Sequence, residues 1–438
     1  MSQSTTRKYV AALHYLDSGW AFAVTHQNNH PSMRLSMLII ATGTISTSLA
    51  QPDLLDLPIR HLLKDELHVS QSQMAMLFGI GALAWYVKPL AGLLVDSVAL
   101  FGTRRRHYLI VSTLAVSALW LLLGIVSHSY SLLLVTVVAM QFMLVIGSTA
   151  LGGFLVEKGK LLGAEGRLVS CRIFVEDACV LVAGPLAGYL AGLPFGTAAM
   201  IGAAIAAMTA PIVAGCVAEP VQEERKVVKA RPLFRDLRLA LNSRAMWLVA
   251  ILSLVSNIPQ SFGTPLYFYQ KNVLTLSDVQ IGSLTAVGGI GGLLASIFYQ
   301  YLCRKLPVKG LLILGTLGPS VGILAYLFYT SVPAALIVEL LGGFVFGIGT
   351  LAFMHSAVIS TLVPSAAFGF ALLMSASNAG DAIGDVLAAL LVERLSMTLF
   401  DLVKLFAAAS AACCLFVFVL PRSLLNHQEG KPIVSIGL

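Results

Sequence analysis

The chain has 438 residues, of which 57% are hydrophobic and 11% charged, and its mean hydropathy is +0.86. Soluble globular domains carry roughly a quarter charged residues, so this composition excludes a soluble protein and indicates a polytopic membrane protein. The formal net charge of +7 does not indicate nucleic-acid binding, because the basic residues alternate from loop to loop instead of forming one face.

The six cysteines show neither a metal-binding nor a disulfide pattern. All of them fall in or at the ends of apolar segments, and none has C-x-x-C spacing. Small, polarizable packing residues are the simpler interpretation. We therefore expect no metal site and no disulfide framework.

Apolar runs long enough to span a bilayer, which takes about 17–25 residues each, follow one another along the chain. They fall near residues 34–58, 72–95, 108–127, 131–154, 169–192, 196–217, 245–268, 279–303, 309–329, 333–355, 366–392 and 399–420. We predict an all-α polytopic membrane protein with about twelve transmembrane helices in two six-helix halves, which is the plan of the major facilitator superfamily.

The polar segments between and around these runs predict the domain boundaries and the orientation. The only long one, 218–244, is rich in arginine and lysine and divides an N-terminal half, 34–217, from a C-terminal half, 245–420. Most other loop cations fall on the same side, so the positive-inside rule makes this linker cytoplasmic. Cytoplasmic tails, 1–33 and 421–438, are expected at both ends, and the first has no apolar core of signal-peptide type.

The stretch between Tyr86 and Tyr108 carries an intramembrane cation and a charged turn. Lys88 lies inside the second run, where a lysine is costly in lipid and must face a protein interior or a water-filled cavity. Asp96 ends the run, where the helix macrodipole disfavours an anion. A cation from Arg104, Arg105 or Arg106 would offset this cost, and we predict a cytoplasmic gate here.

Charged residues also interrupt the fifth run. Arg172 and Glu176 are four residues apart, so they share a helix face and can pair. Two interpretations stay open: a structural ion pair, or a pair that opens and closes during transport with Glu176 taking a proton. Asp177 lies about 100° round the helix and cannot use Arg172 in the same way.

Asn378, Asp381 and Asp385 are polar residues within the eleventh run. Asp381 and Asp385 are four residues apart, and like charges at this spacing repel. In a membrane one carboxyl is expected to be protonated or paired with a cation. Asp381 lies about 22 Å from the start of the helix, past mid-membrane, so we predict a proton or substrate site there.

The seventh run places Asn257 and Gln260 near mid-membrane, on either side of Pro259. Interhelical hydrogen bonding and lining of a cavity are both open for these two amides.

Phosphate-binding signatures are absent from the sequence. The run GGIGG lies in a membrane segment and lacks the Lys-Ser/Thr that a phosphate loop needs. ATP-driven transport is therefore disfavoured, and an ion gradient is the remaining energy source. We expect neither an enzyme nor a cofactor.

The segment KDELHVSQSQMAMLFGIGALAWYVKPLAGLLVDSVALFGTRRRHYLIV, which starts at Lys64, resembles the signature of the folate–biopterin transporter family. The matching features are the Lys-Asp pair at its start, Lys-Pro-Leu from Lys88, Asp96, and the three arginines before Tyr108. Blocks similar to other regions of the family start at Tyr267, Ile297 and Phe370. The chain departs from the pattern at Ala84, Val95 and Ala366-Ala367, where the family usually has proline, serine and an acidic pair.

This resemblance implies proton-coupled uptake of folates, pterins or a related metabolite such as S-adenosylmethionine. The expected partners are a small-molecule substrate, protons and the lipid bilayer, with no nucleic acid, and the chain is expected to act as a monomer. The donor-rich edge of the folate heterocycle suits Asp381 or Asp177, and its glutamate tail suits Lys88 or Arg172.

Two other functions compete with this interpretation. One is an exporter of another small molecule within the same superfamily. The other is a non-transporting assembly factor of a membrane complex, although the cost of several intramembrane charges favours transport. We expect a location in a bacterial inner membrane, with a plastid envelope as the alternative.

Overall fold

The computed structural model describes residues 33–50, 55–69, 71–126, 128–217 and 230–430. Most of the expected tails and the first part of the linker, residues 1–32, 218–229 and 431–438, lie outside the described residues. The chain divides into two compact units, Met1–Ser36 and Met37–Leu438. Only the first turn of one helix is described in the first unit, and the architecture below is that of the second.

The regular secondary structure of the described residues is helical, except for one isolated β-bridge between Leu100 and Thr103. The elements before the linker are α2 (Met33–Leu49), α3 (Asp56–His61), the π-helical turn η2 (Leu62–Glu66), α4 (Gln71–Tyr86), α5 (Lys88–Ser97), α6 (Arg106–Ile125), α7 (Tyr130–Leu162), α8 (Glu165–Ala191) and α9 (Phe195–Cys216). The linker contains α10 (Ala230–Leu241). The elements after it are α11 (Arg244–Asn257), η3 (Ile258–Gln260), α12 (Gly263–Asn272), α13 (Asp278–Lys305), α14 (Val308–Ala325), η4 (Tyr326–Phe328), α15 (Val332–Ser360), η5 (Val363–Ser365), α16 (Ala366–Leu395), α17 (Leu399–Val417) and α18 (Arg422–Leu425).

Each predicted apolar run corresponds to a helix or to a broken helix. Within the described residues, eight helices are long and apolar enough to cross a membrane, or nine if the bent pair α4–α5 counts as one span. Helix α2, with 17 residues, is shorter than these spans, whereas α8 and α16 are 27 and 30 residues long and carry polar side chains in their middle. The predicted all-α polytopic class is confirmed.

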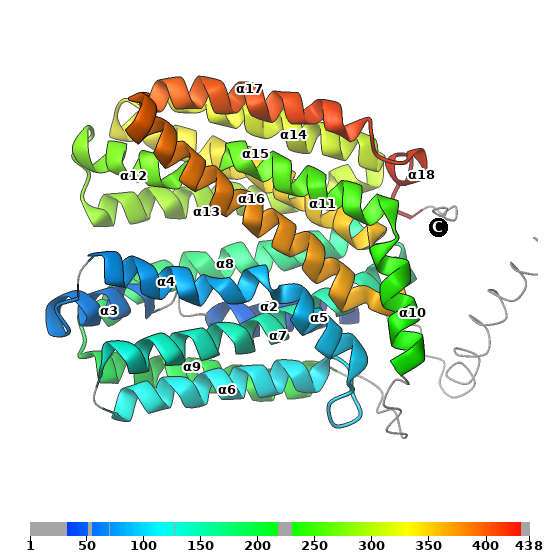
Figure 1. Cartoon of the computed structure of the whole chain (residues 1–438), viewed down its shortest axis with the longest axis horizontal. Coiled ribbons are helices and arrows are strands. Elements are labelled where there is room, and N and C mark those ends of the chain that lie inside the picture. The colour runs from blue at the N-terminus through cyan, green and yellow to red at the C-terminus, as the bar shows by residue number, and fades with distance from the viewer. Residues whose placement is uncertain (1–32, 51–54, 70, 127, 218–229, 431–438) are drawn as a thin grey trace, which may run out of the picture. The chain divides into compact units, whose positions relative to one another are not determined.

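The helices form two groups, one before and one after α10 in the chain, which lie one above the other in Figure 1. We call α2–α9 the N-terminal bundle, α11–α17 the C-terminal bundle, and the end where α10 and α18 lie the linker end. The bundles meet at two junctions: α5 and α7 pack on α16, and α8 packs on α13.

Each bundle has an apolar core of its own. Trp120 and Leu133 belong to the core of the N-terminal bundle, and Tyr329 and Phe406 to that of the C-terminal bundle. Because packed cores resist deformation, separate cores allow the bundles to move against each other as rigid bodies.

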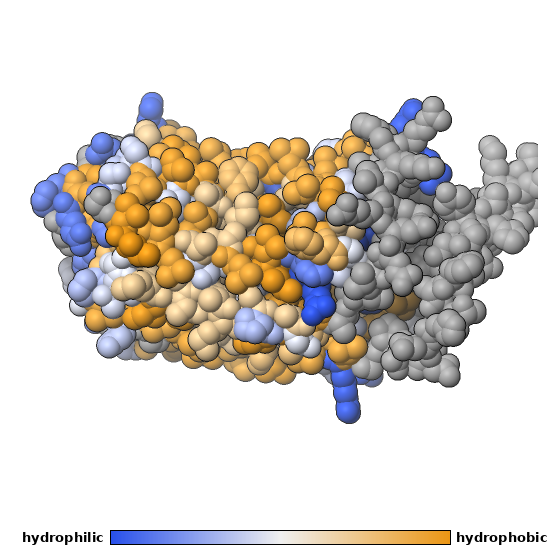
Figure 2. Space-filling view, turned by 90° about the horizontal axis from the view of Figure 1, so that it is seen from below, coloured by the Kyte–Doolittle hydropathy of each residue, from blue (hydrophilic) through white to orange (hydrophobic). Residues whose placement is uncertain are grey.

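The outer surface of the helices is suited to lipid. The face in Figure 2 is hydrophobic across its middle and hydrophilic toward its ends. Exposed apolar side chains such as Leu121, Val135 and Met208 contribute to the surface of the N-terminal bundle. Apolar side chains over hydrogen-bonded helices are what a hydrocarbon solvent requires.

Two runs that were expected to be continuous are broken at prolines. The second run bends by 42° between α4 and α5, and the seventh is divided by η3. Pro89 has no N–H, which leaves the Trp85 carbonyl without its helical donor. That carbonyl accepts a hydrogen bond from Ser375 Oγ of α16 at 3.0 Å.

The same reasoning applies to Pro259 in η3. Its missing N–H frees the Val255 carbonyl, which accepts a contact of 3.6 Å from Cys413 Sγ of α17. Both breaks therefore exchange a hydrogen bond within one helix for a contact between helices.

Helices α7, α8 and α15 extend beyond the predicted runs at the linker end. Lys158 and Lys160 therefore lie on α7 and not in a loop, which corrects the expected boundary. Hydropathy marks where the apolar segment ends, whereas the helix continues and its lysines reach polar surroundings. Lys160 Nζ donates to the carbonyl of Thr361, which lies in the other bundle.

Candidate functional site

Lys88 is the first residue of α5 and lies at the break that Pro89 creates. Its side chain is buried, with 2% of the residue exposed. Its Nζ donates to Ser148 Oγ of α7 at 3.0 Å and lies 4.8 Å from the centre of the Trp85 ring. As expected, the cation faces the protein interior.

Arg172 of α8 reaches the same serine. Its Nη2 lies 3.4 Å from Ser148 Oγ, and its Nε lies 3.8 Å from Glu176 Oε2. The predicted pairing of Arg172 with Glu176 is therefore present, as a loose contact without a hydrogen bond. The Nε and Nη1 atoms of Arg172 are buried and have no hydrogen-bond partner.

These side chains form what we call the cationic cluster: Lys88, Ser148, Arg172 and Glu176. It contains a lysine, an arginine and one carboxylate, so its basic groups outnumber its acidic ones. Lys88 and Arg172 are buried, while the side chain of Glu176 is 41% exposed. Buried donors without partners are costly, and an anion such as a carboxylate would satisfy them with charge-assisted hydrogen bonds.

The two carboxylates of α16 have different surroundings. Asp385 accepts hydrogen bonds from the backbone N (2.8 Å) and the Oγ1 (2.5 Å) of Thr264, so it caps the N-terminus of α12. Asp381 accepts one hydrogen bond, from Ser261 Oγ at 2.9 Å, and is exposed. Both oxygens of Asp385 therefore bond α12, the second part of the broken helix. Asp381 uses only Oδ1, and its other oxygen has no hydrogen-bond partner among the described residues.

The two predicted amides lie beside this break. Asn257 Nδ2 donates to Ser253 O and to Ser377 Oγ of α16, both at 2.8 Å. Gln260 Nε2 donates to Ser256 O at 2.7 Å. The interhelical hydrogen bonding expected of Asn257 is present, whereas Gln260 bonds within its own segment.

Glycines bring α16 close to the broken helix. A Cβ atom at Gly380 would lie 2.3 Å from Leu254 O, and one at Gly384 would lie 2.1 Å from Ile258 O. Such close approach of the backbones fixes Asp381 and Asp385 beside η3 and α12.

The cationic cluster and the α16 carboxylates are not in direct contact. Within the described ranges, no hydrogen bond or ion pair joins Lys88 or Arg172 to Asp381 or Asp385. Asn378 is half-buried on α16. The two sets are linked through the hydrogen bond from Ser375 to Trp85, next to Lys88.

Asp177 faces away from the cationic cluster. Its Oδ2 would lie 2.7 Å from a Cβ atom at Gly292, so it faces α13 at the other junction. The same oxygen is buried and has no hydrogen-bond partner. The helical angle between Asp177 and Arg172 accounts for this separation.

The residues of the predicted gate around Asp96 are in contact with one another. Arg105 Nη2 lies 3.2 Å from Asp96 Oδ1 and 2.6 Å from Glu157 Oε1. Burial alone would lower the pKa of Arg105, but Glu157 and Asp96 more than offset this and hold it above its ordinary value. Arg105 thus remains a cation. Arg106 donates to Ala214 O at 2.5 Å, and Arg104 is half-buried in the same turn.

The sequence did not reveal the main partner of Asp96. Its carboxylate accepts the backbone N–H groups of Ala367 (3.2 Å) and Phe368 (2.8 Å) in the first turn of α16. A Cβ atom at Gly92 would lie 2.5 Å from Phe368 Cα. Backbone groups carry no sequence signal, so only the fold could identify this contact.

Serines are the other functional residues that sequence reasoning missed. Ser148 joins the two cations, Ser261 holds Asp381, and Ser375 reaches Trp85. Serine is common in membrane helices, where it usually bonds its own backbone, so it gave no separate signal.

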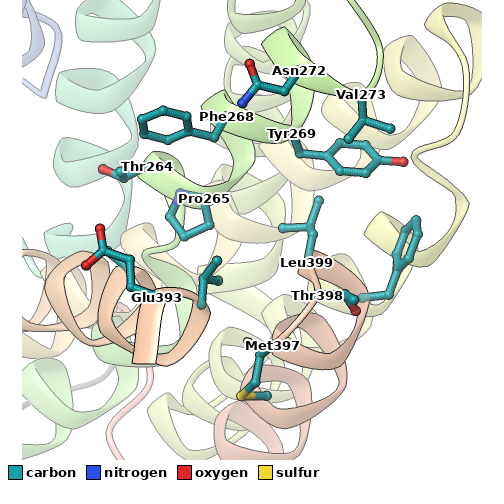
Figure 3. A pocket seen from close by; sticks show the side chains of 13 residues that line it. Thr264, Pro265, Phe268, Tyr269, Asn272, Val273, Glu393, Met397, Thr398 and Leu399 are labelled. Carbon is teal, nitrogen blue, oxygen red and sulfur yellow. The ribbon is translucent and has the colours of Figure 1, made fainter. Parts of the chain in front are cut away.

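A pocket of about 630 Å³ lies between α12, the end of α16 and the start of α17 (Figure 3). Phe268, Tyr269 and Leu399 supply apolar walls, and Glu393 lies at its edge. Thr264, which holds Asp385, also lines it. It contains none of the predicted site residues.

Comparison with known proteins gives consistent matches. The model of the BT1 family matches residues 51–431. The folate-biopterin transporter of Synechocystis is 27% identical over 359 residues, which cover 78% of this chain and 72% of that protein. Folate transporter 1 of Plasmodium falciparum is 22% identical over 440 residues, which cover 93% and 83%.

The fold is similar to that of FucP. One solved structure is a variant of the E. coli fucose:proton symporter, with a TM-score of 0.68, 13% identity and coverage of 88% of this chain and 98% of FucP. Another shows FucP as a major facilitator superfamily transporter in the outward conformation, with a TM-score of 0.66, 14% identity and coverage of 89% and 99%. At such low identity the likeness shows the fold alone, which is that of the major facilitator superfamily, as predicted.

Proposed function

The chain belongs to the BT1 family and is a secondary transporter of the major facilitator fold, and from this premise we propose that it takes up a folate, a pterin or a related metabolite by proton-coupled alternating access. The observation that carries the proposal is the buried cationic cluster, in which Nε and Nη1 of Arg172 have no hydrogen-bond partner among the described residues, although Nε lies 3.8 Å from Glu176 Oε2. The names of the Synechocystis and Plasmodium relatives support the substrate class.

Folate combines a flat, donor-rich heterocycle with a carboxylate tail, and the site offers a complement to each. Lys88 and Arg172 bind the tail, because an anion there satisfies the free donors of Arg172. Asp381 binds the heterocycle edge with the oxygen that Ser261 does not use. Asn257, Gln260 and Asn378 contribute polar lining from the broken helix and α16. Asp177 lies against α13, which favours Asp381 over it for this role.

Proton coupling requires a carboxyl group whose charge changes during the cycle. Asp381 and Glu176 are the two candidates, because both are accessible and neither is held by two hydrogen bonds. Asp385 is a weaker candidate, because both of its oxygens bond Thr264. The fold neighbour FucP is a fucose:proton symporter, which makes the same energy source plausible here.

Alternating access follows from two bundles that move around a central site. In this proposal residues 34–217 and 245–420 form the moving halves, residues 218–244 join them, and the linker end faces the cytoplasm together with both termini. Asp96 and Arg105, with Arg104 and Arg106 in the same turn, form the cytoplasmic gate. We place the protein in a bacterial inner membrane, with a plastid envelope as the alternative, and expect a monomer.

Uptake into folate-deficient cells tests the proposal. Labelled folate and a labelled pterin without the glutamate tail are supplied to cells that express the chain, with and without a protonophore. Protonophore-sensitive accumulation of either compound is the expected result. If cells with membrane-inserted protein accumulate neither compound, the proposed substrate class is refuted. Efflux of either compound from preloaded cells would show that the chain exports its substrate instead of taking it up.

A further inference from the structure

The last described residues of the chain fold back onto the linker end, where α18 lies (Figure 1). We call residues 426–430 the return segment. It is anchored to the C-terminal bundle by Val308 N, which donates to His427 O at 2.9 Å, and by Gln428 Nε2, which donates to Arg304 O at 2.9 Å.

The return segment also binds the N-terminal bundle. Gly430 N donates to Gly163 O at 3.1 Å, and His427 Nε2 lies 3.8 Å from Glu165 Oε2. Glu429 forms an ion pair with Arg167, and its Oε2 accepts the backbone N–H of Arg167 at 3.2 Å. The segment therefore joins both bundles at one end of the molecule.

Glu429 occupies the junction between α8 and α13. Its side chain is completely buried, with 0% exposed. A Cβ atom at Gly166 would lie 2.7 Å from Glu429 Oε2 and 2.6 Å from Cys303 Cβ of α13. The carboxylate is thus enclosed between two helices that belong to different bundles.

This arrangement parallels the gate at the other junction. The residue before α8, Ala164, and the residue before α16, Ser365, make no side-chain capping hydrogen bond. Each helix is instead capped by a carboxylate from the other bundle: α16 by Asp96, and α8 by Glu429. A carboxylate at a helix N-terminus satisfies backbone donors and the positive end of the macrodipole.

We propose that Glu429 is the second of two reciprocal gate residues: it caps α8 from the C-terminal bundle as Asp96 caps α16 from the N-terminal bundle, and it must withdraw before the linker end opens. The inference rests on the alternating access proposed above. The bundles cannot separate at the α8–α13 junction while Glu429 bonds Arg167 of one and lies against Cys303 of the other.

Cys303 provides a native reporter for this movement. It is 0% exposed and lies at the α8–α13 junction. Cys171, Cys179, Cys216, Cys413 and Cys414 are replaced by serine or alanine, and Cys303 is labelled with a polar maleimide in purified, detergent-solubilised protein. The measurement needs no substrate and no membrane orientation, so it can fail independently of the proposed uptake.

Glu429→Gln removes the charge and keeps the size. We expect it to raise the labelling rate of Cys303 by about tenfold, which corresponds to about 1.4 kcal/mol, because the charge-assisted contact with Arg167 is lost. The matched control is Gln428→Ala, a neighbour that bonds only the C-terminal bundle and should leave the rate unchanged.

A pair of truncations tests the segment without a buried substitution. A chain that stops after Leu425 loses the return segment, and one that stops after Gly430 keeps it. Fast labelling in the first and parental labelling in the second supports the proposal. Parental labelling in a monodisperse Glu429→Gln protein, or in a monodisperse chain that stops after Leu425, overturns it.

Discussion

The polar side chains of the candidate site are of two kinds. In some, the polar atoms are hydrogen-bonded, and in others a polar atom has no partner among the described residues. Asp385 uses both oxygens on Thr264, whereas Asp381 uses one on Ser261. Lys88 is bound to Ser148, whereas Arg172 keeps two buried donors free. Polar atoms without a partner are the ones that a substrate can satisfy, which supports the proposed binding roles of the buried Arg172 and the exposed Asp381.

Arg172→Gln is expected to weaken folate uptake selectively. Loss of a charge-assisted contact to the glutamate tail costs roughly 1.5–3 kcal/mol, so the KM for folate should rise about 10- to 100-fold. Uptake of a pterin without the tail should change little. Lys404→Ala, which removes an exposed lysine of α17, is the control. Equal losses for both compounds would show that Arg172 does not bind the tail.

Asp381→Asn and Asp385→Asn are expected to have different effects, the first on transport and the second on stability. Asp381→Asn should reach the membrane at parental abundance and lose protonophore-sensitive accumulation of both compounds, because the amide cannot exchange a proton. Asp385→Asn should lower the melting temperature, because the cap of α12 is worth about 1 kcal/mol. Uptake and thermal unfolding of both variants provide the check. Parental accumulation by Asp381→Asn would remove it from the mechanism.

Helices in this protein are joined where regular structure is interrupted. The Trp85 carbonyl, freed by Pro89, receives Ser375 of α16, and the N-terminus of α16 receives Asp96 of α5. The bent pair α4–α5 and helix α16 are therefore joined by hydrogen bonds between side chains and backbone groups at two levels. Gly92 permits this, because its missing side chain leaves room for the backbone at Phe368.

Gly92→Ala is expected to destabilise the closed junction by about 1–3 kcal/mol, because the new methyl group meets backbone atoms that cannot rotate away. Gly79→Ala is the matched control, since a Cβ atom there meets nothing within 4 Å. The control should be neutral or stabilising by up to about 1 kcal/mol, as expected for alanine in a helix. Thermal unfolding of the purified variants measures both effects, and equal melting temperatures would contradict the argument.

The described helices form two bundles, each with an apolar core of its own, that are joined at the linker end by polar contacts and by a small apolar cluster in which Val95 and Tyr108 pack with Ala367. Asp96, Lys160 and Glu429 each bind backbone groups of the other bundle. Polar contacts suit a reversible closure, because water can replace them when the bundles separate. Contacts at both junctions join the bundles at the linker end in this structure.

Rigid-body movement predicts that the two junctions open together. Asp96→Asn, at the α5–α16 junction, should therefore raise maleimide labelling of Cys303 at the α8–α13 junction by several-fold. Asp401→Asn is the comparison, because it removes the charge from the capping box that Asp401 forms with Thr398 at the start of α17, away from either junction. If Asp96→Asn loosens the structure only around residue 96, Cys303 will be labelled at the parental rate, and this result would contradict rigid-body movement.

The amino-acid sequence by itself determined the membrane class, the helical fold class and the polar residues that interrupt the apolar runs. Hydropathy and charge are local properties, and the bilayer acts on each segment separately. Lys88, Arg172, Glu176 and the gate around Asp96 could therefore be predicted as candidates.

The pairings of Arg172 with Glu176 and of Asp96 with an arginine could be expected from the sequence, whereas only the tertiary structure decided the other contacts. The contacts of Ser148 with both cations, the caps of α8 and α16, and the commitment of Asp385 to α12 each join residues far apart in the chain. Several of the partners are backbone N–H groups, which every residue except proline carries and no sequence pattern marks. Their use depends on which helices meet, and that is a property of the packed bundles.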